Sequence, residues 1–255
     1  MCGRYVITSP PAAIRALFGY PEQPNFPPRY NVAPTQPIPI VRLNEGRRQF
    51  ALMRWGLIPA WVKDPKAFSL LINARAESVL DKPAFRSAMR RRRCLIPADG
   101  FYEWRETGGR KQAYFVRRRD GAPFAFAGLC ETWTGPNGEE LDTAAIVTTT
   151  ANRTLSAIHD RMPVILPDQA FDLWLDCAKV DAPTATALLV PARDDALEAY
   201  QVSPAVNRVA NDAAALIAPY VEQTNEQTAA TAPSAASPDA KPKPAKKSPD
   251  QLSLL

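Results

Sequence analysis

Cys2 is the residue whose position most directly suggests covalent chemistry. Methionine aminopeptidase removes Met1 when the second residue is small, so the mature chain is expected to begin with a 1,2-aminothiol. The amine has a reference pKa of about 7.7–8 and the thiol one of about 8.5, so each has a reactive fraction near neutral pH. Such a pair condenses with an aldehyde to an imine, and thiolate attack then closes a thiazolidine ring. Taken alone, however, a cysteine at position 2 is more often an incidental feature of the terminus.

The single histidine of the chain is a candidate acid–base group. His159 lies in the segment SAIHDRMPVIL, after a helix-like stretch and before an expected strand. Asp160 and Arg161 follow immediately and could orient its ring, although a lone histidine is more often a surface or core residue than a catalytic one.

Glu103 is a second acid–base candidate, in the segment ADGFYEW. Strand alternation places it on the same face as Phe101 and opposite Tyr102 and Trp104. A carboxylate among aromatic residues is either an ordinary strand-edge glutamate or a group whose proton affinity is raised for acid–base work. The sequence alone leaves both readings open. In LLINARAES, Asn73 could similarly hydrogen-bond a substrate or cap a turn.

The composition is that of a globular chain, and its charge favours a polyanionic partner without settling it. The 255 residues carry a net charge of +5, and arginine dominates the basic residues before the last 34. Arginine suits phosphate binding and stacking on bases. No apolar stretch reaches the roughly 20 residues needed to cross a bilayer, and no secretory signal is evident, so a cytoplasmic location is expected. Four scattered cysteines and one histidine support neither a metal site nor a disulfide framework, and no cofactor is expected.

The elements that must position these residues are mostly strands. One short helix is expected to start at Ser9-Pro10-Pro11 and to stop at Gly19, and a second is expected over 81–92. Most strands follow one another without an intervening helix, which predicts an α+β fold with a mainly antiparallel, curved or barrel-like sheet and short peripheral helices. No Gly-rich phosphate loop is present. The strands are expected at 39–43, 49–55, 94–96, 101–105, 113–118, 124–130 and 144–149.

Two regions are expected, a folded domain over 1–221 and a tether over 222–255. The second region is rich in Ala, Pro, Ser, Thr and Lys, which predicts a disordered linker. Its last residues break this pattern with apolar side chains, which indicates that a partner binds there.

Six segments together resemble one known family, the SOS-response-associated peptidase (SRAP) family, which includes the HMCES-like abasic-site processing proteins. They occur in the order found in that family, between residue 2 and about residue 166, and the similarity is expected to extend to about residue 220. The segments are MCGRY at the start, RYNVAPT at 29–35, WGLIPAW at 55–61, INARAES at 72–78, PADGFYEW at 97–104 and IHDRMPVIL at 158–166.

The resemblance implies a covalent reaction with abasic sites in single-stranded DNA. Cys2 would form a stable thiazolidine with the ring-opened deoxyribose, and Asn73 would position the sugar and the nucleophile. Glu103 would shuttle protons, and His159 would help to open the furanose and process the imine. An imine also permits strand-cleaving β-elimination as a weak side reaction.

The resemblance further implies a basic channel for single-stranded DNA. Arg4, Arg75 and Arg161 lie in matching motifs and are the candidate phosphate contacts, with Trp61 as the stacking residue. Related bacterial sequences often have paired tryptophans at this point, whereas Val62 follows Trp61 here. The run Arg90–Arg93 either extends this footprint or offsets a helix dipole.

The final QLSLL resembles the motif by which bacterial repair polymerases bind the sliding clamp. Leu252, Leu254 and Leu255 would fill apolar pockets and Gln251 would hydrogen-bond at the rim, while the tether provides reach. This would hold a monomeric protein at the replication fork, near the nucleoid, during the response to DNA damage.

Two other functions remain open on the sequence. Cys2, Glu103 and His159 would also suit a peptidase or a self-processing hydrolase with an N-terminal nucleophile. A non-catalytic adaptor linking single-stranded DNA to the clamp would instead bind in a salt-sensitive way, indifferent to an abasic site or to Cys2→Ala.

Overall fold

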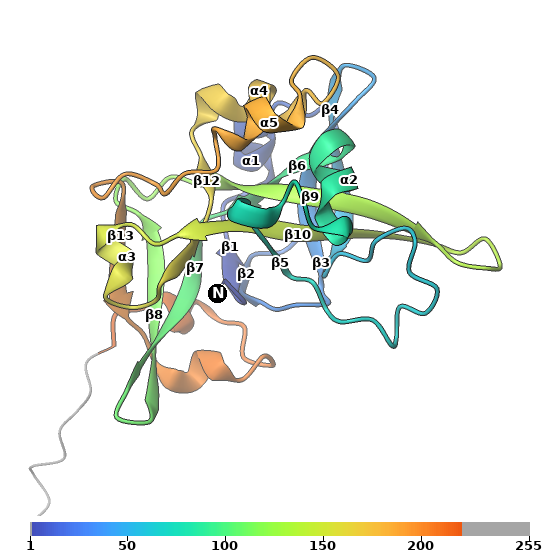
Figure 1. The fold of residues 1–255 in the computed structure, drawn as a ribbon. Coiled ribbons are helices and arrows are strands. Elements are labelled where there is room, and N and C mark those ends of the chain that lie inside the picture. Colours follow the sequence, from blue (N-terminus) through green and yellow to red (C-terminus); the bar gives the residue numbers. More distant parts are fainter. Residues whose placement is uncertain (1, 221–255) are drawn as a thin grey trace, which may run out of the picture. The chain divides into compact units, whose positions relative to one another are not determined.

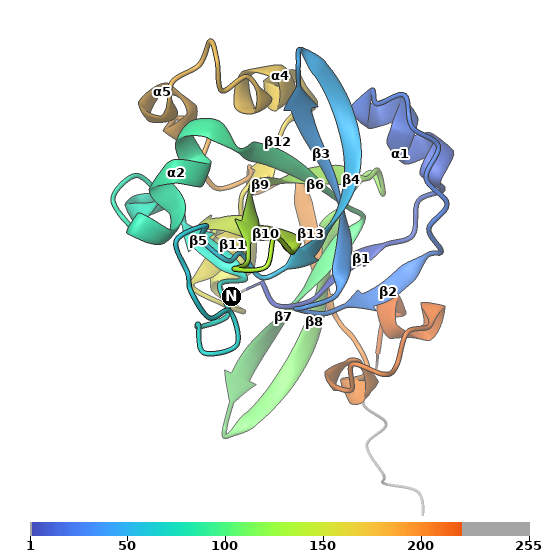
Figure 2. The same ribbon diagram turned by 90° about the vertical axis from the view of Figure 1, so that its right-hand side faces the viewer.

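Five strands pair in a closed ring at the centre of the fold. Figures 1 and 2 show where these strands lie. The computed structural model describes residues 2–220, and the predicted tether over 222–255 with its QLSLL end lies outside them. Every pairing in the ring is antiparallel except that of β4 (Arg47–Trp55) with β10 (Glu140–Thr150). The expected antiparallel, barrel-like sheet is therefore confirmed. The ring strands are β3 (Pro37–Asn44), β4 (Arg47–Trp55), β6 (Arg93–Ala98), β9 (Phe124–Thr134) and β10 (Glu140–Thr150).

Three short strands extend this sheet. β5 and β11 both pair with β10, and β12 pairs with β9. They were not among the expected strands, although a strand was anticipated after His159. With two or three residues each, they are too short to show an alternating pattern. Their bounds are β5 (Asn73–Arg75), β11 (Arg161–Pro163) and β12 (Ile165–Leu166).

A second sheet of five strands carries the N-terminal residues. Its order is β13, β8, β7, β1, β2, and β7 begins two residues after β6 ends. Gly100 makes this transition possible, because a Cβ there would lie 2.3 Å from the ring of Phe115 and 2.8 Å from the carbonyl oxygen of Val116. The strands are β1 (Tyr5–Ile7), β2 (Arg29–Val32), β7 (Gly100–Thr107), β8 (Arg110–Arg118) and β13 (Leu197–Gln201).

Short helices cover the outside of the barrel. α1 (Pro11–Phe18) ends at Gly19, which has a φ of 68° and donates its N–H to Arg15 O, as the sequence predicts. α2 spans Pro83–Arg91 rather than 81–92, because Pro83 occupies the first turn and the backbone of Lys82 is extended. The other helices are α3 (Arg153–Ser156), α4 (Phe171–Leu175), α5 (Ala182–Thr186) and the 3-10 turns η1 (Ala76–Ser78), η2 (Asp168–Ala170), η3 (Pro204–Asn207) and η4 (Ala214–Ile217).

Arg93 belongs to this framework rather than to a surface footprint. The side chain is 2% exposed, and its guanidinium donates to the carbonyl oxygens of Trp174 at 2.6 Å, Val180 at 2.7 Å and Met89 at 3.0 Å. Of the run Arg90–Arg93, its last member therefore ties β6 to α2 and α4. No helix of residues 2–220 is long and apolar enough to span a membrane.

Candidate active site

Cys2 lies inside the fold, in contact with the core between the two sheets. Its side chain is 0% exposed and belongs to the apolar cluster that contains Tyr5, Trp55 and Phe101. Burial raises the pKa of its thiol well above the ordinary value, and the carboxylate of Glu103 raises it further. The thiol is therefore protonated at neutral pH.

Asn73 is brought to Cys2 by a long-range strand pairing. β5 runs parallel to β10, with Asn73 opposite Ile146, which carries the side-chain amide to the N-terminal residues. Asn73 Nδ2 donates to the carbonyl oxygen of Cys2 at 2.9 Å. The buried Oδ1 atom of Asn73 has no hydrogen-bond partner among residues 2–220, so it remains an acceptor for a further donor.

Glu103 is placed beside the N-terminus by the register of the second sheet. Tyr5 pairs with Phe101, and Tyr102 N–H donates to Arg4 O at 3.0 Å, so β7 follows the first residues of the chain. Glu103 is buried, with only 2% of its surface exposed. Burial raises its pKa to about 7, and the carboxylate of Asp160 adds to this effect. Glu103 can therefore give and accept a proton near neutrality.

His159 follows α3, whose first turn is capped by Asn152 Oδ1 accepting from Leu155 N–H. Its Nδ1 accepts the N–H of Arg161 at 2.9 Å, and Asp160 Oδ1 lies 2.8 Å from the same nitrogen. The carboxylate favours a protonated ring, but burial outweighs it and lowers the pKa of His159. The neutral ring that accepts at Nδ1 carries its proton on Nε2.

Glu103 and His159 line one open cavity of about 720 Å³. The structure thus brings together the two acid–base candidates from segments that are distant in sequence, and the nucleophile candidate lies beside one of them. The other residues that line the cavity are Arg4, Trp104, Arg105, Glu106, Lys111, Ala157, Ile158 and Asn207.

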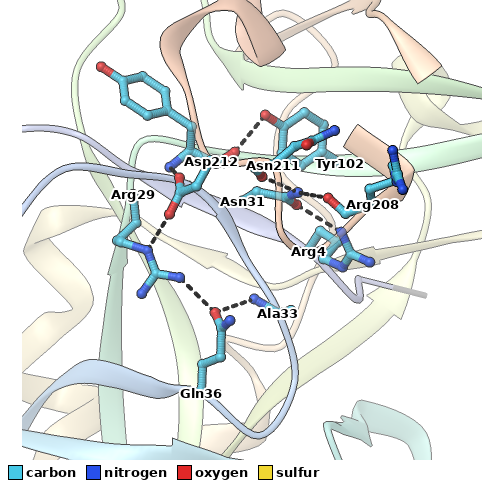
Figure 3. A network of polar contacts seen from close by, with 10 residues as sticks. Arg4, Arg29, Asn31, Ala33, Gln36, Tyr102, Arg208, Asn211 and Asp212 are labelled. Atoms are coloured by element: carbon cyan, nitrogen blue, oxygen red, sulfur yellow. Dashed lines mark hydrogen bonds and ion pairs between the residues drawn. The ribbon is translucent and has the colours of Figure 1, made fainter. Parts of the chain in front are cut away.

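One wall of this cavity is held by a buried asparagine on β2, shown in Figure 3. Asn31 is 0% exposed, and its Nδ2 donates to the carbonyl oxygens of Val206, Arg208 and Asn211. Its Oδ1 accepts from Arg4 Nη1 at 2.8 Å. Asn31 therefore ties the segment 205–212 to β1 and β2.

The same segment reaches the cavity through Asn207. Its Oδ1 accepts the indole N–H of Trp104 at 2.8 Å, which fixes the orientation of that ring. At the other end of the network, Asp212 accepts from Arg29 Nε and from the N–H of Tyr30. Figure 3 shows Arg29 and Asp212 in contact. The wall is thus a hydrogen-bonded unit built from both ends of the described chain.

The family comparison identifies the fold that carries this site. The model of the family "SOS response associated peptidase (SRAP)" matches residues 1–209. The chain belongs to the SRAP family. The resemblance of the six segments is therefore confirmed.

Other SRAP proteins are similar over most of their length. Abasic site processing protein YoqW of Bacillus subtilis is 41% identical over 222 residues, which cover 85% of this chain and 99% of that protein. Abasic site processing protein HMCES of Gallus gallus is 32% identical, covering 92% and 83%. A crystal structure of a protein from Bacteroides thetaiotaomicron, 26% identical, has a TM-score of 0.77 and covers 86% of this chain and 100% of its own.

Of the predicted DNA contacts of this SRAP protein, two side chains are bonded to other residues of the protein and two are exposed. Arg161 forms a bidentate ion pair with Glu77, 3.0 Å at each oxygen, and also donates to Thr148 O at 2.7 Å. The Arg4 guanidinium donates to Asn31 Oδ1 and to the carbonyl oxygen of Val206 in the cavity wall. By contrast, Arg75 is exposed, and Trp61 is 59% exposed with its ring edge-on to Phe68. Of these four candidates, Arg4 alone lines the cavity of Glu103 and His159.

Several cavity residues were not singled out by the sequence. Arg105 lies two positions beyond Glu103, so strand alternation alone could have placed it on the same face. Asn207 carries no local signal, because its position depends on the bonds of Asn31 and Trp104.

Proposed function

We propose that this SRAP protein processes abasic sites in single-stranded DNA by condensing the Cys2 aminothiol with the aldehyde of the ring-opened deoxyribose. The observation that carries the proposal is the convergence of Cys2, Asn73 and Glu103, with His159 in the same cavity as Glu103. The names of the relatives as abasic site processing proteins support it. Met1 must be removed first, because the Cys2 nitrogen is otherwise an amide.

The first step is opening of the closed sugar. An abasic deoxyribose is mostly a cyclic hemiacetal, so a base must take the proton of the anomeric hydroxyl while an acid protonates the ring oxygen. His159 suits this step through its Nε2–H, because Nδ1 already accepts the N–H of Arg161. Nε2–H would hydrogen-bond the ring oxygen while water relays the hydroxyl proton to that oxygen. The C1′ aldehyde is thereby formed without loss of atoms.

The second step is imine formation at C1′. The neutral amine of Cys2 adds to the aldehyde, and the protonated form of Glu103 supplies the proton with which the hydroxyl leaves as water. The raised pKa of Glu103 keeps much of this carboxyl protonated near neutral pH. Asn73 holds the carbonyl of Cys2, which limits the motion of the attacking residue.

The third step closes the ring. Glu103, now a carboxylate, accepts the thiol proton of Cys2 as Sγ adds to the iminium carbon, and the C=N electron pair returns to the nitrogen, which keeps its one proton. One water is released overall for each thiazolidine formed. Because the buried thiol is protonated at first, the amine acts before the sulfur. Proton abstraction at C2′ of the imine would instead give β-elimination, the expected lyase side reaction.

The test is covalent capture of an abasic oligonucleotide. Protein whose free N-terminal Cys2 is verified by mass spectrometry is mixed with single-stranded DNA that carries one abasic site. We expect a shifted band that survives denaturation without borohydride and that Cys2→Ala abolishes. Cys2→Ser keeps the amine but loses the sulfur, so its imine should be trapped only when borohydride is added.

Failure of the verified protein to form this band would contradict the proposal. Cleavage of a peptide that precedes Cys2, in the absence of DNA capture, would then favour the hydrolase function. Salt-sensitive binding that ignores the abasic site would favour the adaptor function.

A further inference from the structure

The cavity beside Glu103 continues along β7 into a positively charged region that the three steps above do not use. Arg105 follows Glu103 by two residues on β7, and Lys111 lies on β8 of the same hairpin. Two residues of a strand span about 6.6 Å, which is comparable with the length of one nucleotide along an extended strand. If one nucleotide lies at Glu103, the next nucleotide along the strand would therefore lie near the charge of Arg105.

Arg105 is held in a position suited to an anion. Its guanidinium carbon lies 5.2 Å from the ring centroid of Tyr114, which fixes the plane of the group. Its Nε is buried and has no hydrogen-bond partner among residues 2–220. A buried donor without an acceptor costs roughly 1–3 kcal/mol, and an oxyanion supplies the acceptor that such a group lacks.

The edge of β7 at this point is also unpaired within the described chain. β1 pairs with β7 only near Phe101 and Gly100, so the edge beyond Trp104 lacks a neighbouring strand among residues 2–220. The N–H of Tyr102 faces this edge, and by alternation so does that of Glu106. Figures 1 and 2 show the β7–β8 hairpin extending past the other strands of its sheet.

We propose that the phosphodiester next to the abasic nucleotide binds in this cavity against Arg105, so that the DNA strand leaves the site along the β7–β8 hairpin. This inference rests on the proposed function, because it takes the reacting sugar to lie at Glu103. The carboxylate of Glu106 lines the same cavity, but it is opposite Lys111 in the strand register and is offset by that charge.

The experiment measures binding without the covalent step. A single-stranded oligonucleotide with a tetrahydrofuran residue in place of the abasic sugar has no aldehyde, and its affinity is measured by fluorescence anisotropy over a range of salt. We expect Arg105→Gln to bind about ten-fold more weakly, with a salt slope lower by about 0.7. Lys111→Gln should lower the slope less, because Lys111 is opposite Glu106 in the strand register and its charge is offset there.

Arg117→Gln is the matched control. Arg117 also lies on this hairpin's β8, with its guanidinium 5.5 Å from the ring of Tyr200, but it pairs with Glu198 and does not line the cavity. It removes the same charge and the same kind of ring contact, so it should bind as the unaltered protein does. Equal losses in Arg105→Gln and Arg117→Gln would overturn the proposal.

Truncated oligonucleotides separate a direct contact from a general charge effect. One begins with the tetrahydrofuran residue and the other ends with it, so each lacks the phosphate on one side. The difference between the unaltered protein and Arg105→Gln should disappear with one of them and persist with the other. Persistence with both would overturn the proposal. Failure of the aldehyde oligonucleotide to crosslink would overturn the proposed function instead, because this binding readout needs no aldehyde.

Discussion

A carboxyl group with a pKa of about 7 occupies the position where the proposed chemistry needs an acid and then a base. Strand alternation predicts that Glu103 and Phe101 share a face, and the burial of Phe101 with Cys2 confirms it. The direction of the pKa shift was not predictable, because burial is set by β1 and by the loop after α3. The contact of Asn73 with Cys2 likewise depends on the pairing of β5 with β10.

The pH dependence of capture follows from this carboxyl group. Glu103 must be protonated to release water, so the rate falls as pH rises through about 7. The amine of Cys2 must be neutral, so the rate rises toward its reference pKa of about 8. We therefore expect a bell-shaped profile with its maximum between the two values, measured as the initial rate of crosslinking.

Replacement of Glu103 tests the assignment of the falling limb. Glu103→Gln should slow capture by about 100-fold and leave only the limb that rises with pH. Glu140→Gln, at an exposed position at the start of β10, is the charge-matched control and should keep the full profile. A falling limb that survives in Glu103→Gln would assign it to another group.

At the scale of elements, the longer strands could be read from the sequence and the shorter ones could not. The predicted strand 124–130 extends to Thr134, and 144–149 extends in both directions, because the two strands pair as a long hairpin. By contrast, β1, β2 and β5 have three or four residues, and their partners are distant in sequence. Their position is fixed by tertiary contacts such as those of Asn31.

Asn31 is therefore expected to be a strong contributor to stability. Asn31→Ala would leave the carbonyl oxygens of residues 206, 208 and 211 without this donor and would remove an acceptor of Arg4. We expect a loss of about 3 kcal/mol in the free energy of unfolding, measured by urea denaturation. Asn44→Ala, at an exposed strand end, should change it by less than about 0.5 kcal/mol. A similar small change in Asn31→Ala would show that the wall is held by other contacts.

At the scale of the whole molecule, the succession of strands predicts an antiparallel barrel but not how it closes. Closure depends on the parallel pairing of β10 with β4, through Thr143 opposite Arg54 and Ala144 opposite Trp55. No local pattern indicates a parallel contact between strands that are almost 90 residues apart. The membership of the SRAP family, in contrast, was evident from six ordered segments.

The segment QLSLL at 251–255 lies outside the described residues, and we propose that it binds the sliding clamp. Leu252→Ala with Leu254→Ala in the full chain should weaken binding to the purified clamp by at least about ten-fold, measured by surface plasmon resonance. Ser253→Ala, within the same segment, is the matched control and should bind normally. Equal binding by the double variant would exclude this segment as the contact.

The place of β1 in its sheet has a mechanical consequence. β1 lies between β2 and β7, and it begins three residues after Cys2, the residue that would be joined to DNA. A motor that pulled on the crosslinked strand would load β1 along its own axis. The hydrogen bonds on both sides would then share the force in shear instead of opening one after another. The same small strand that presents the nucleophile would therefore anchor the lesion against traction, with its lifetime under load set by the rate of forced unfolding.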